Sequence, residues 1–243
     1  MITAIIQARM LSTRLPGKVM IAFSGNNLLG HIIDRLSHSK KISKIVVATT
    51  TNTADDKLTD WLEKNNIPYY RGDESDVLNR YFEAAKRFEA NHVARVTSDD
   101  PFKDPQVIDD VASLYFEKSL DFAYNNNPPS FPEGLDTEIF SFEALTIANR
   151  DAVDSFEREH VTQHFYRNPG KFKQMNLSSP QDNSHLRWTL DTVEDLAMTK
   201  AVYEKLYKRG QIFLTNDILE LFKTNPEIQK LNENVSRSTM YKK

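Results

Sequence analysis

Short apolar segments alternate with amphipathic segments along the first half of the chain. Residues 2–8 (ITAIIQA), 44–50 (KIVVATT), 67–72 (IPYYRG) and 92–97 (HVARVT) are too short for buried helices and are rich in β-branched or aromatic residues. Apolar residues at helical spacing follow each of them. Strands that alternate with helices are joined by crossovers and lie parallel, so this order predicts an α/β fold with a mostly parallel sheet.

The pattern changes after about residue 120. Residues 125–138 (NNNPPSFPEGLDTE) concentrate Asn and Pro and indicate a long excursion from the sheet. The elements expected beyond it are a strand and a helix at 137–151, a helix at 156–172 ended by Pro169 and Gly170, and strands at 171–179 and 186–192. The polar residues 226–243 are expected to be loosely held. We therefore predict one domain, 1–243, with an inserted arm at 125–185.

Composition excludes several classes of protein. The chain has 243 residues, of which 40% are hydrophobic, enough for one sizeable core. A net charge of −3 does not favour a nucleic-acid or membrane-surface protein. Cys is absent, which excludes disulfides, thiolate metal sites and a Cys nucleophile. With no signal-like start and no long apolar stretch, we expect a soluble, cytoplasmic protein.

The first predicted strand leads into a basic loop, IIQARMLSTRLPGK at residues 5–18. The loop carries Arg9, Arg14 and Lys18 and no carboxylate. Ligands of open parallel sheets bind beyond the carboxyl ends of the strands, which is where this loop is expected. Unpaired cations so close together repel one another unless an anion lies between them, so we expect the loop to bind one.

Acidic residues follow other strands of the predicted sheet. Asp99 and Asp100 come after residues 92–97. Asp191 lies at the end of residues 186–192, and Glu194 and Asp195 follow it. One crevice would then receive a basic loop and two acidic clusters. A nucleoside triphosphate with Mg²⁺ needs this combination, because cations bind phosphate oxygens and carboxylates bind the hard metal.

Each of these features also has a purely structural interpretation. The basic loop could be a solvated surface, Gly17 a turn residue, and Asp99 or Asp191 part of a helix-capping turn. The sequence has no Walker motif, since LPGKVM lacks the upstream glycines and the following Ser or Thr. It also has no G-x-G-x-x-G, which disfavours a dinucleotide fold of the dehydrogenase type.

The sequence closely resembles the cytidylyltransferases that make CMP-activated sugar acids. These include the acylneuraminate and 3-deoxy-manno-octulosonate cytidylyltransferases, and the spore-coat-polysaccharide branch is the most similar. The resemblance covers nearly the whole chain in the expected order. Its segments are IIQARMLSTRLPGKVM (5–20), RGDESDVLNRY (71–81), RVTSDDPFKDP (95–105), FPEGLDTEIFSFEAL (131–145), EREHVTQHFYRNP (157–169) and RWTLDTVEDL (187–196).

The resemblance implies a Rossmann-like nucleotidyltransferase sheet, similar to that of glycosyltransferase-A enzymes, and assigns roles to individual residues. The implied nucleotide-binding residues are Ala8, Arg9, Ser12, Arg14, Lys18, Arg71 and Asp76. Asp99 and Asp191, with Asp195 in support, would bind Mg²⁺, and the implied catalytic residues are Arg14, Lys18, Asp99 and Asp191. Arg158 is a candidate for an acceptor carboxylate, and His160 could either orient the acceptor or be a packed structural residue.

The implied reaction is attack of an acceptor oxygen on the α-phosphorus of CTP, with pyrophosphate leaving toward Arg14 and Lys18. CTP is expected to be preferred over UTP, with ATP and GTP very poor. The family's octulosonate enzymes carry a Gln where this chain has Thr97, and their acceptor segment differs, so the sequence does not identify the acceptor. A nucleotide-sugar-dependent glycosyltransferase and a catalytically silent nucleotide-binding protein are the alternatives.

The arm is expected to serve acceptor binding and dimerisation. Phe140, Phe142, Leu145 and Phe165 alternate with charged positions, so the arm should have an apolar face to bury. One chain is expected to offer little sheet to cover that face, which favours a symmetric homodimer. The resemblance implies the same, because these enzymes usually dimerise through the corresponding insertion.

Overall fold

The computed structural model describes residues 1–236, and a sheet of seven strands lies at its centre. The strand order across the sheet is β5-β4-β1-β6-β8-β7-β9. The strands are β1 (Ile2–Gln7), β4 (Ile42–Thr50), β5 (Tyr69–Gly72), β6 (His92–Thr97), β7 (Phe122–Tyr124), β8 (Glu138–Ser141) and β9 (Gln174–Asn176), and a separate two-stranded ribbon contains β2 (Ala22–Phe23) and β3 (Asn26–Asn27).

The predicted α/β fold with a mostly parallel sheet is confirmed. β1 pairs in parallel with β4 and β6, and β4 pairs in parallel with β5. Side chains of β1 point alternately to the two faces, so Ala4 and Ile6 enter one core and Ile5 enters the other. All three are fully buried, as expected of a parallel strand covered on both faces.

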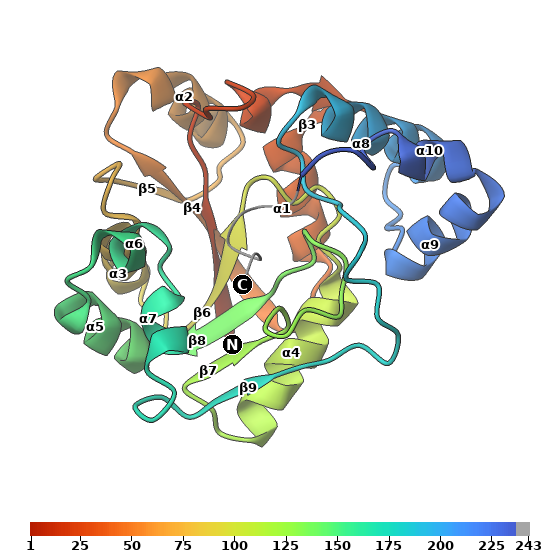
Figure 1. Cartoon of the computed structure of the whole chain (residues 1–243). Helices are drawn as coiled ribbons and strands as arrows, with labels where there is room; N and C mark the ends of the chain where they lie inside the picture. Colours follow the sequence, from red (N-terminus) through yellow and green to blue (C-terminus); the bar gives the residue numbers. More distant parts are fainter. Residues whose placement is uncertain (237–243) are drawn as a thin grey trace.

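Helices cover both faces of the sheet (Figure 1). α3 and α5 pack on the face of Ile5, and α1, α2, α4, α8 and α9 contribute to the core on the opposite face. The α-helices are α1 (Leu28–Ser37), α2 (Asp56–Lys64), α3 (Val77–Arg87), α4 (Pro105–Glu117), α5 (Phe142–Asp151), α6 (Ser155–Glu159), α7 (Gln163–Arg167), α8 (Val193–Leu206), α9 (Thr215–Thr224) and α10 (Pro226–Lys230).

Residues 125–185 are joined to the sheet. β8 lies between β6 and β7 and is antiparallel to both, and β9 extends the sheet in parallel with β7. Phe140, Leu145 and Phe165 are fully buried within the chain, and Phe142 packs against the same core. The expectation that one chain could not cover this apolar face is therefore wrong, because β8 inserts into the sheet and α3 covers it.

Two predicted elements of the second half differ in the structure. The helix expected at 156–172 is broken into α6 and α7, and Val161 between them has a φ of 49°, which a continuous helix cannot contain. The strand expected at 186–192 is extended but has only a single bridge, between Arg187 and Glu133. Its longer-range backbone–backbone hydrogen bonds are made with Glu133 and Asp99, which belong to loops, so no ladder forms.

The C-terminal segment is packed more firmly than its polar sequence suggests. Ile228 of α10 is 5% exposed and Asn232 is 6% exposed. The expectation of a loosely held end is wrong for these residues, and residues 237–243 lie outside the part that the structure describes.

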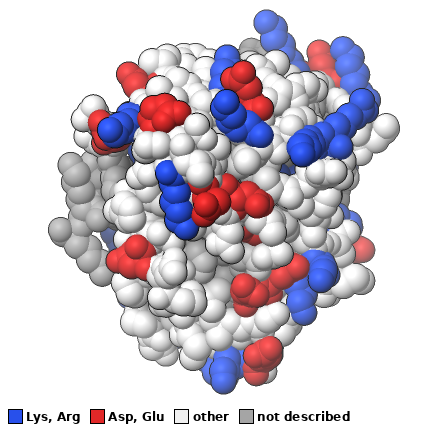
Figure 2. Space-filling view, turned by 90° about the vertical axis from the view of Figure 1, so that its right-hand side faces the viewer, with Lys and Arg blue, Asp and Glu red and all other residues white. Residues whose placement is uncertain are grey.

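The surface charge and the helices of the described residues are consistent with the near-neutral net charge and with the lack of a long apolar stretch in the sequence. Both signs of charge are spread over the face that lies on the right-hand side of Figure 1, as Figure 2 shows. Within residues 1–236 there is no helix of the length and apolarity that a bilayer crossing needs.

Candidate active site

Loops after β1, β5 and β6 meet at one edge of the sheet and enclose a cavity of about 750 Å³. Because β1 is parallel to β4 and β6, the carboxyl ends of these strands share this edge. The predicted site residues that line the cavity are Ala8, Arg9, Ser12, Arg14, Lys18, Asp99, His160 and Asp191. The predicted site residues that lie elsewhere in the described chain are Arg71, Asp76, Arg158 and Asp195.

The basic loop is closed by hydrogen bonds to the backbone of Met10. Met10 O accepts from Ser12 N at 3.0 Å and from Gly17 N at 2.8 Å, and Met10 N donates to Asp55 Oδ1 at 2.6 Å. Gly17 has a φ of 71°, in the left-handed region that favours glycine. The loop's shape is therefore set by the backbone and by Asp55.

Every cation of the basic loop has a carboxylate partner from a distant segment. Arg9 Nη1 lies 3.3 Å from Glu74 Oε1, and Arg14 Nη2 lies 2.8 Å from Asp191 Oδ2. Lys18 Nζ lies 2.8 Å from Asp191 Oδ1. The premise that these cations are unpaired is wrong, because the fold brings the carboxylates to them from loops far away in sequence.

Lys18 is buried between the two predicted metal-binding residues. Its Nζ lies 3.4 Å from Asp99 Oδ2 and also donates to Leu190 O at 3.0 Å. Burial by itself lowers the pKa of Lys18, but the charges of Asp99 and Asp191 outweigh it and raise that pKa above its ordinary value. Desolvation opposes ionisation of Asp99, yet Lys18 and the Thr97 hydroxyl hold the Asp99 pKa at about 2.

The placement of Asp99 and Asp191 fits a divalent cation such as Mg²⁺. Both carboxylates reach the position of one ammonium group, so they converge on a common point of positive charge. Residues 1–236 contain no group of three or more His, Cys, Asp or Glu side chains that could hold a metal by themselves. Mg²⁺ commonly binds through one or two carboxylates and completes its shell with water and substrate phosphates, which these two residues allow.

Asp195 is not placed to bind a metal in the cavity. Its side chain is fully buried and accepts hydrogen bonds from Arg187 Nε and Nη2 and from the backbone N–H groups of Asp191 and Thr192, at 3.0–3.1 Å. It forms a capping box with Thr192 at the start of α8. Thr192 is therefore the N-cap of α8, and the alternative interpretation that Asp191 caps this helix is wrong.

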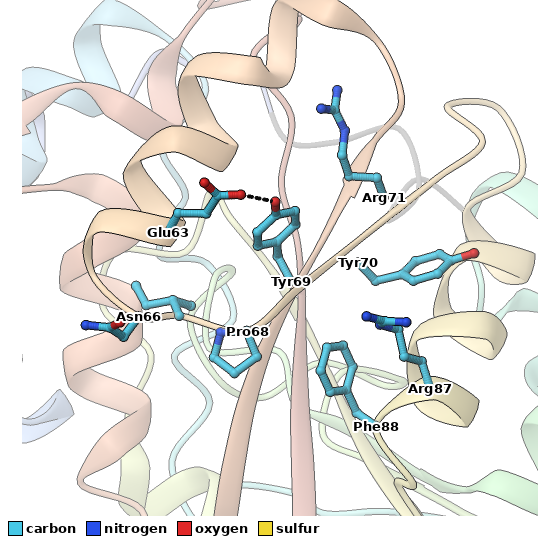
Figure 3. Close-up of a pocket in the computed structure, with 9 residues that line it drawn as sticks. Glu63, Asn66, Pro68, Tyr69, Tyr70, Arg71, Arg87 and Phe88 are labelled. Carbon is cyan, nitrogen blue, oxygen red and sulfur yellow. Dashed lines mark hydrogen bonds between the residues drawn. The ribbon is translucent and has the colours of Figure 1, made fainter.

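Arg71 lies outside the cavity, beside a shallow groove at the β5 edge of the sheet (Figure 3). Its guanidinium donates to Thr50 O and Asn52 O and to Asp56 Oδ1, each at 2.8 Å. Arg71 therefore does not line the cavity that contains the other implied nucleotide-binding residues of the basic loop. Arg71 instead holds the 50–56 segment that carries Asp55, the partner of Met10.

Arg158 and Asp76 form a bidentate ion pair. Arg158 Nε and Nη2 lie 2.9 and 2.6 Å from the Asp76 oxygens, and Arg158 Nη1 donates to Asn149 O at 2.7 Å. Asp76 also caps α3 by accepting from Asn79 N at 3.0 Å. Arg158 thus clamps α6 to α3 and does not face the cavity, which leaves His160 as the predicted acceptor residue on the cavity wall.

His160 is held at the wall by Phe156, whose ring lies edge-on at a centroid distance of 4.4 Å. Burial lowers the pKa of His160 below its ordinary value, and Arg95 adds to this while Glu159 opposes it. The lowered pKa favours the neutral ring, which offers one donor and one acceptor nitrogen.

Three residues of the site escaped the sequence reasoning. No sequence pattern indicated Glu74, because its partner Arg9 lies 65 residues away. Arg80 lines the cavity, is 3% exposed, and its Nε has no hydrogen-bond partner within residues 1–236. Arg187 precedes Asp191 by four residues, and that spacing was the one available signal for their ion pair of 3.0 Å.

The family model described as Cytidylyltransferase matches residues 3–217. The spore coat polysaccharide biosynthesis protein SpsF of Bacillus subtilis is 31% identical over 230 residues, covering 92% of this chain and 94% of its own. A 3-deoxy-manno-octulosonate cytidylyltransferase of Geobacter sulfurreducens is 32% identical over 111 residues, covering 45% of this chain and 43% of its own. A solved cytidylyltransferase from Leptospira borgpetersenii superposes with a TM-score of 0.89 at 32% identity, covering 98% of both chains.

Proposed function

The chain belongs to the cytidylyltransferase family, and on that premise we propose that it transfers CMP from CTP to an acidic sugar and releases pyrophosphate. The proposed acceptor is a nonulosonic or ulosonic acid destined for a surface polysaccharide or glycan. The names of two relatives, one in spore coat polysaccharide biosynthesis and one acting on 3-deoxy-manno-octulosonate, support this choice. The convergence of Arg14, Lys18, Asp99 and Asp191 on one cavity is the observation that carries the proposal.

The basic loop would bind the triphosphate. Arg14 is half exposed and lies at the cavity wall, so its guanidinium can leave Asp191 and bind phosphate oxygens. Lys18 is buried, so its ammonium group can move from Asp191 to a phosphate oxygen only by a small shift. As the acceptor oxygen forms its bond to the α-phosphorus, the bond from that phosphorus to the bridging oxygen breaks, and Arg14 and Lys18 stabilise the charge on the departing pyrophosphate.

Asp99 and Asp191 would hold Mg²⁺. When bound there, the ion neutralises charge at the α-phosphate and polarises the acceptor. When Lys18 and Arg14 turn to phosphate, Asp99 loses Lys18 and Asp191 keeps only Arg187, so Mg²⁺ would replace the positive charge that the two carboxylates lose. His160 would orient the acceptor, because its neutral ring can accept a hydrogen bond from a sugar hydroxyl.

We also propose a homodimer whose interface includes the surface next to the part of the cavity wall that contains His160. Val153 is 93% exposed and Phe156 is 36% exposed, and both lie within a few residues of Ser155, Glu159 and His160 on the cavity wall. Exposed apolar side chains beside a binding site suit a protein contact.

The decisive experiment is pyrophosphate release from CTP and Mg²⁺ with a panel of sugar acids, phosphosugars and phosphonates. We expect release with a sugar acid and none from the Asp191→Asn variant, which controls for contaminating activity. CTP binding without release for any acceptor would favour a silent nucleotide-binding protein. Sugar transfer from a nucleotide-sugar donor would favour a glycosyltransferase.

A further inference from the structure

A buried network of polar side chains connects the C-terminal segment to Asp191. Arg187 is at its centre and is 7% exposed. Its Nη1 lies 3.0 Å from Glu133 Oε1, and its Nη2 lies 3.0 Å from both Asp191 Oδ2 and Asp195 Oδ2. Arg187 Nε donates to Asp195 Oδ1 at 3.1 Å. One guanidinium thus binds three carboxylates at fixed positions.

Asn232 forms the far end of this network. Its Nδ2 donates to Asp195 Oδ1 at 2.9 Å and to Arg187 O at 3.0 Å. Both contacts use the amide nitrogen, which can donate two hydrogen bonds, whereas an aspartate at this position would have no donor. Asn232, which follows α10, therefore contacts both Asp195, which binds the Arg187 guanidinium, and the backbone carbonyl of Arg187.

The network fixes the orientation of Asp191. Arg187 holds Asp191 Oδ2, and Asp195 accepts from the Asp191 backbone N–H at 3.0 Å. Oδ1 of Asp191 is then left to face Lys18 in the cavity. Arg14 and Lys18 line the cavity and can turn to phosphate, whereas Arg187 is buried outside its lining and remains on Asp191.

We propose that Arg187, held by Asp195 and Asn232, is a positioning residue that fixes the Asp191 carboxylate for metal binding. The inference rests on the proposed function, since it concerns the cation that Asp99 and Asp191 would hold. Groups that hold and orient metal ligands contribute to metal affinity even though they do not touch the ion. By this route the C-terminal segment sets the metal affinity of a site formed mainly by the first half of the chain.

The test compares two variants with the same chemical change. Asn232→Asp removes the Nδ2 donor and places a carboxylate against Asp195, while Asn234→Asp adds the same charge at an exposed position two residues away. Mn²⁺ binding to the CTP-saturated protein is measured by electron paramagnetic resonance. We expect Asn232→Asp to weaken Mn²⁺ binding about tenfold or more, and Asn234→Asp to leave it unchanged.

Two further measurements separate positioning from general damage. Calorimetric titration with CTP in EDTA should give the wild-type affinity for both variants, because Asn232 is separated from the basic loop by Arg187, Asp195 and Asp191, and only Asp191 contacts that loop. Ile228→Ala removes packing from the same segment and should lower the unfolding temperature without changing Mn²⁺ affinity. If Asn232→Asp does not fold, Asn232→Ala tests the same two hydrogen bonds without an added charge.

Equal Mn²⁺ affinity in folded Asn232→Asp and Asn234→Asp would overturn the inference, and so would an equal loss of metal affinity in Ile228→Ala. Wild-type protein that bound CTP and Mn²⁺ but released no pyrophosphate with any acceptor would overturn the proposed function alone. The difference between the two variants would still decide the role of the network.

Discussion

Lys18 Nζ lies 2.8 Å from Asp191 Oδ1, although 173 residues separate the two in the chain. Arg14 contacts the other oxygen of the same carboxylate at 2.8 Å. The two side chains proposed to bind phosphate therefore form ion pairs with a side chain proposed to bind the metal. Binding of a metal–triphosphate complex would exchange these internal ion pairs for contacts with the ligand, which keeps the buried charges compensated throughout.

Replacement of Asp191 tests the centre of the site. Asp191→Asn should lower the turnover number at least about 10²–10³-fold, because the amide neither binds Mg²⁺ well nor balances Lys18. Pyrophosphate release under saturating CTP measures the effect, and circular dichroism reports whether the fold is kept. Asp60→Asn, at an exposed position of α2, provides the matched control. Near-normal turnover in Asp191→Asn would contradict the assignment.

Nucleotide choice tests the role of Arg71. We expect calorimetry to show CTP binding more tightly than UTP, with ATP and GTP very weak. Arg71→Ala should weaken CTP and UTP binding by the same factor, since Arg71 supports the 50–56 segment and lies outside the cavity. A selective loss of CTP binding would instead show that Arg71 reads the base directly. Tighter binding of ATP than of CTP would refute the pyrimidine preference.

Two adjacent aspartates should respond to pH with opposite sign. The pKa of Asp99 is held at about 2, below its ordinary 3.8, so its stabilising contribution is complete above pH 3.8 and is lost as the pH falls toward 2. Burial raises the pKa of Asp100 to about 7, so the free energy of unfolding should decrease as the pH rises from 3.8 to 7.

Urea unfolding between pH 2 and pH 8 measures both effects. Asp99→Asn should remove the acid-side loss of stability, and Asp100→Asn should remove the decrease toward neutral pH. The two variants control for each other, because they make the same change at neighbouring positions. Identical pH profiles for both variants would show that the two carboxylates do not differ as described.

Arg158 and His160 should separate stability from acceptor binding. Arg158→Met removes a bidentate ion pair and a backbone contact, which should lower the free energy of unfolding by about 1–3 kcal/mol. His160→Ala should change that free energy little and raise the KM for the acceptor. Chemical unfolding and acceptor kinetics measure the two effects. A raised acceptor KM in Arg158→Met at unchanged stability would assign the acceptor contact to Arg158.

The proposed dimer predicts a constant mass on dilution. Light scattering should give twice the 28.0 kDa of one chain at micromolar concentration. Val153→Glu would place a charge in the proposed contact and should yield monomers, whereas Val193→Glu, also at an exposed valine, should not. Fully active wild-type monomers at micromolar concentration would exclude the dimer.

The amino-acid sequence by itself determined the architecture and the family. The alternation of apolar strands with amphipathic helices up to residue 120 predicts a parallel sheet, because a helical crossover between consecutive strands makes them run in the same direction. The same logic placed the loops after β1 and β6 at one edge. The cavity found there contains Arg14, Lys18 and Asp99, as strand polarity predicts, and Asp191 reaches it from a segment that joins no strand of the sheet.

Only the tertiary structure decided which charge meets which. Asp195 and Asp191 look alike in the sequence LDTVED, yet one is fully buried against Arg187 and the other faces the cavity. Arg158 and Arg71 became supports because an unpaired guanidinium takes the nearest carboxylates and carbonyls that the fold offers. The residues in these three pairings lie 8, 82 and 21 positions apart in the sequence, and an interaction that acts over a few ångströms leaves no local pattern across the longer separations.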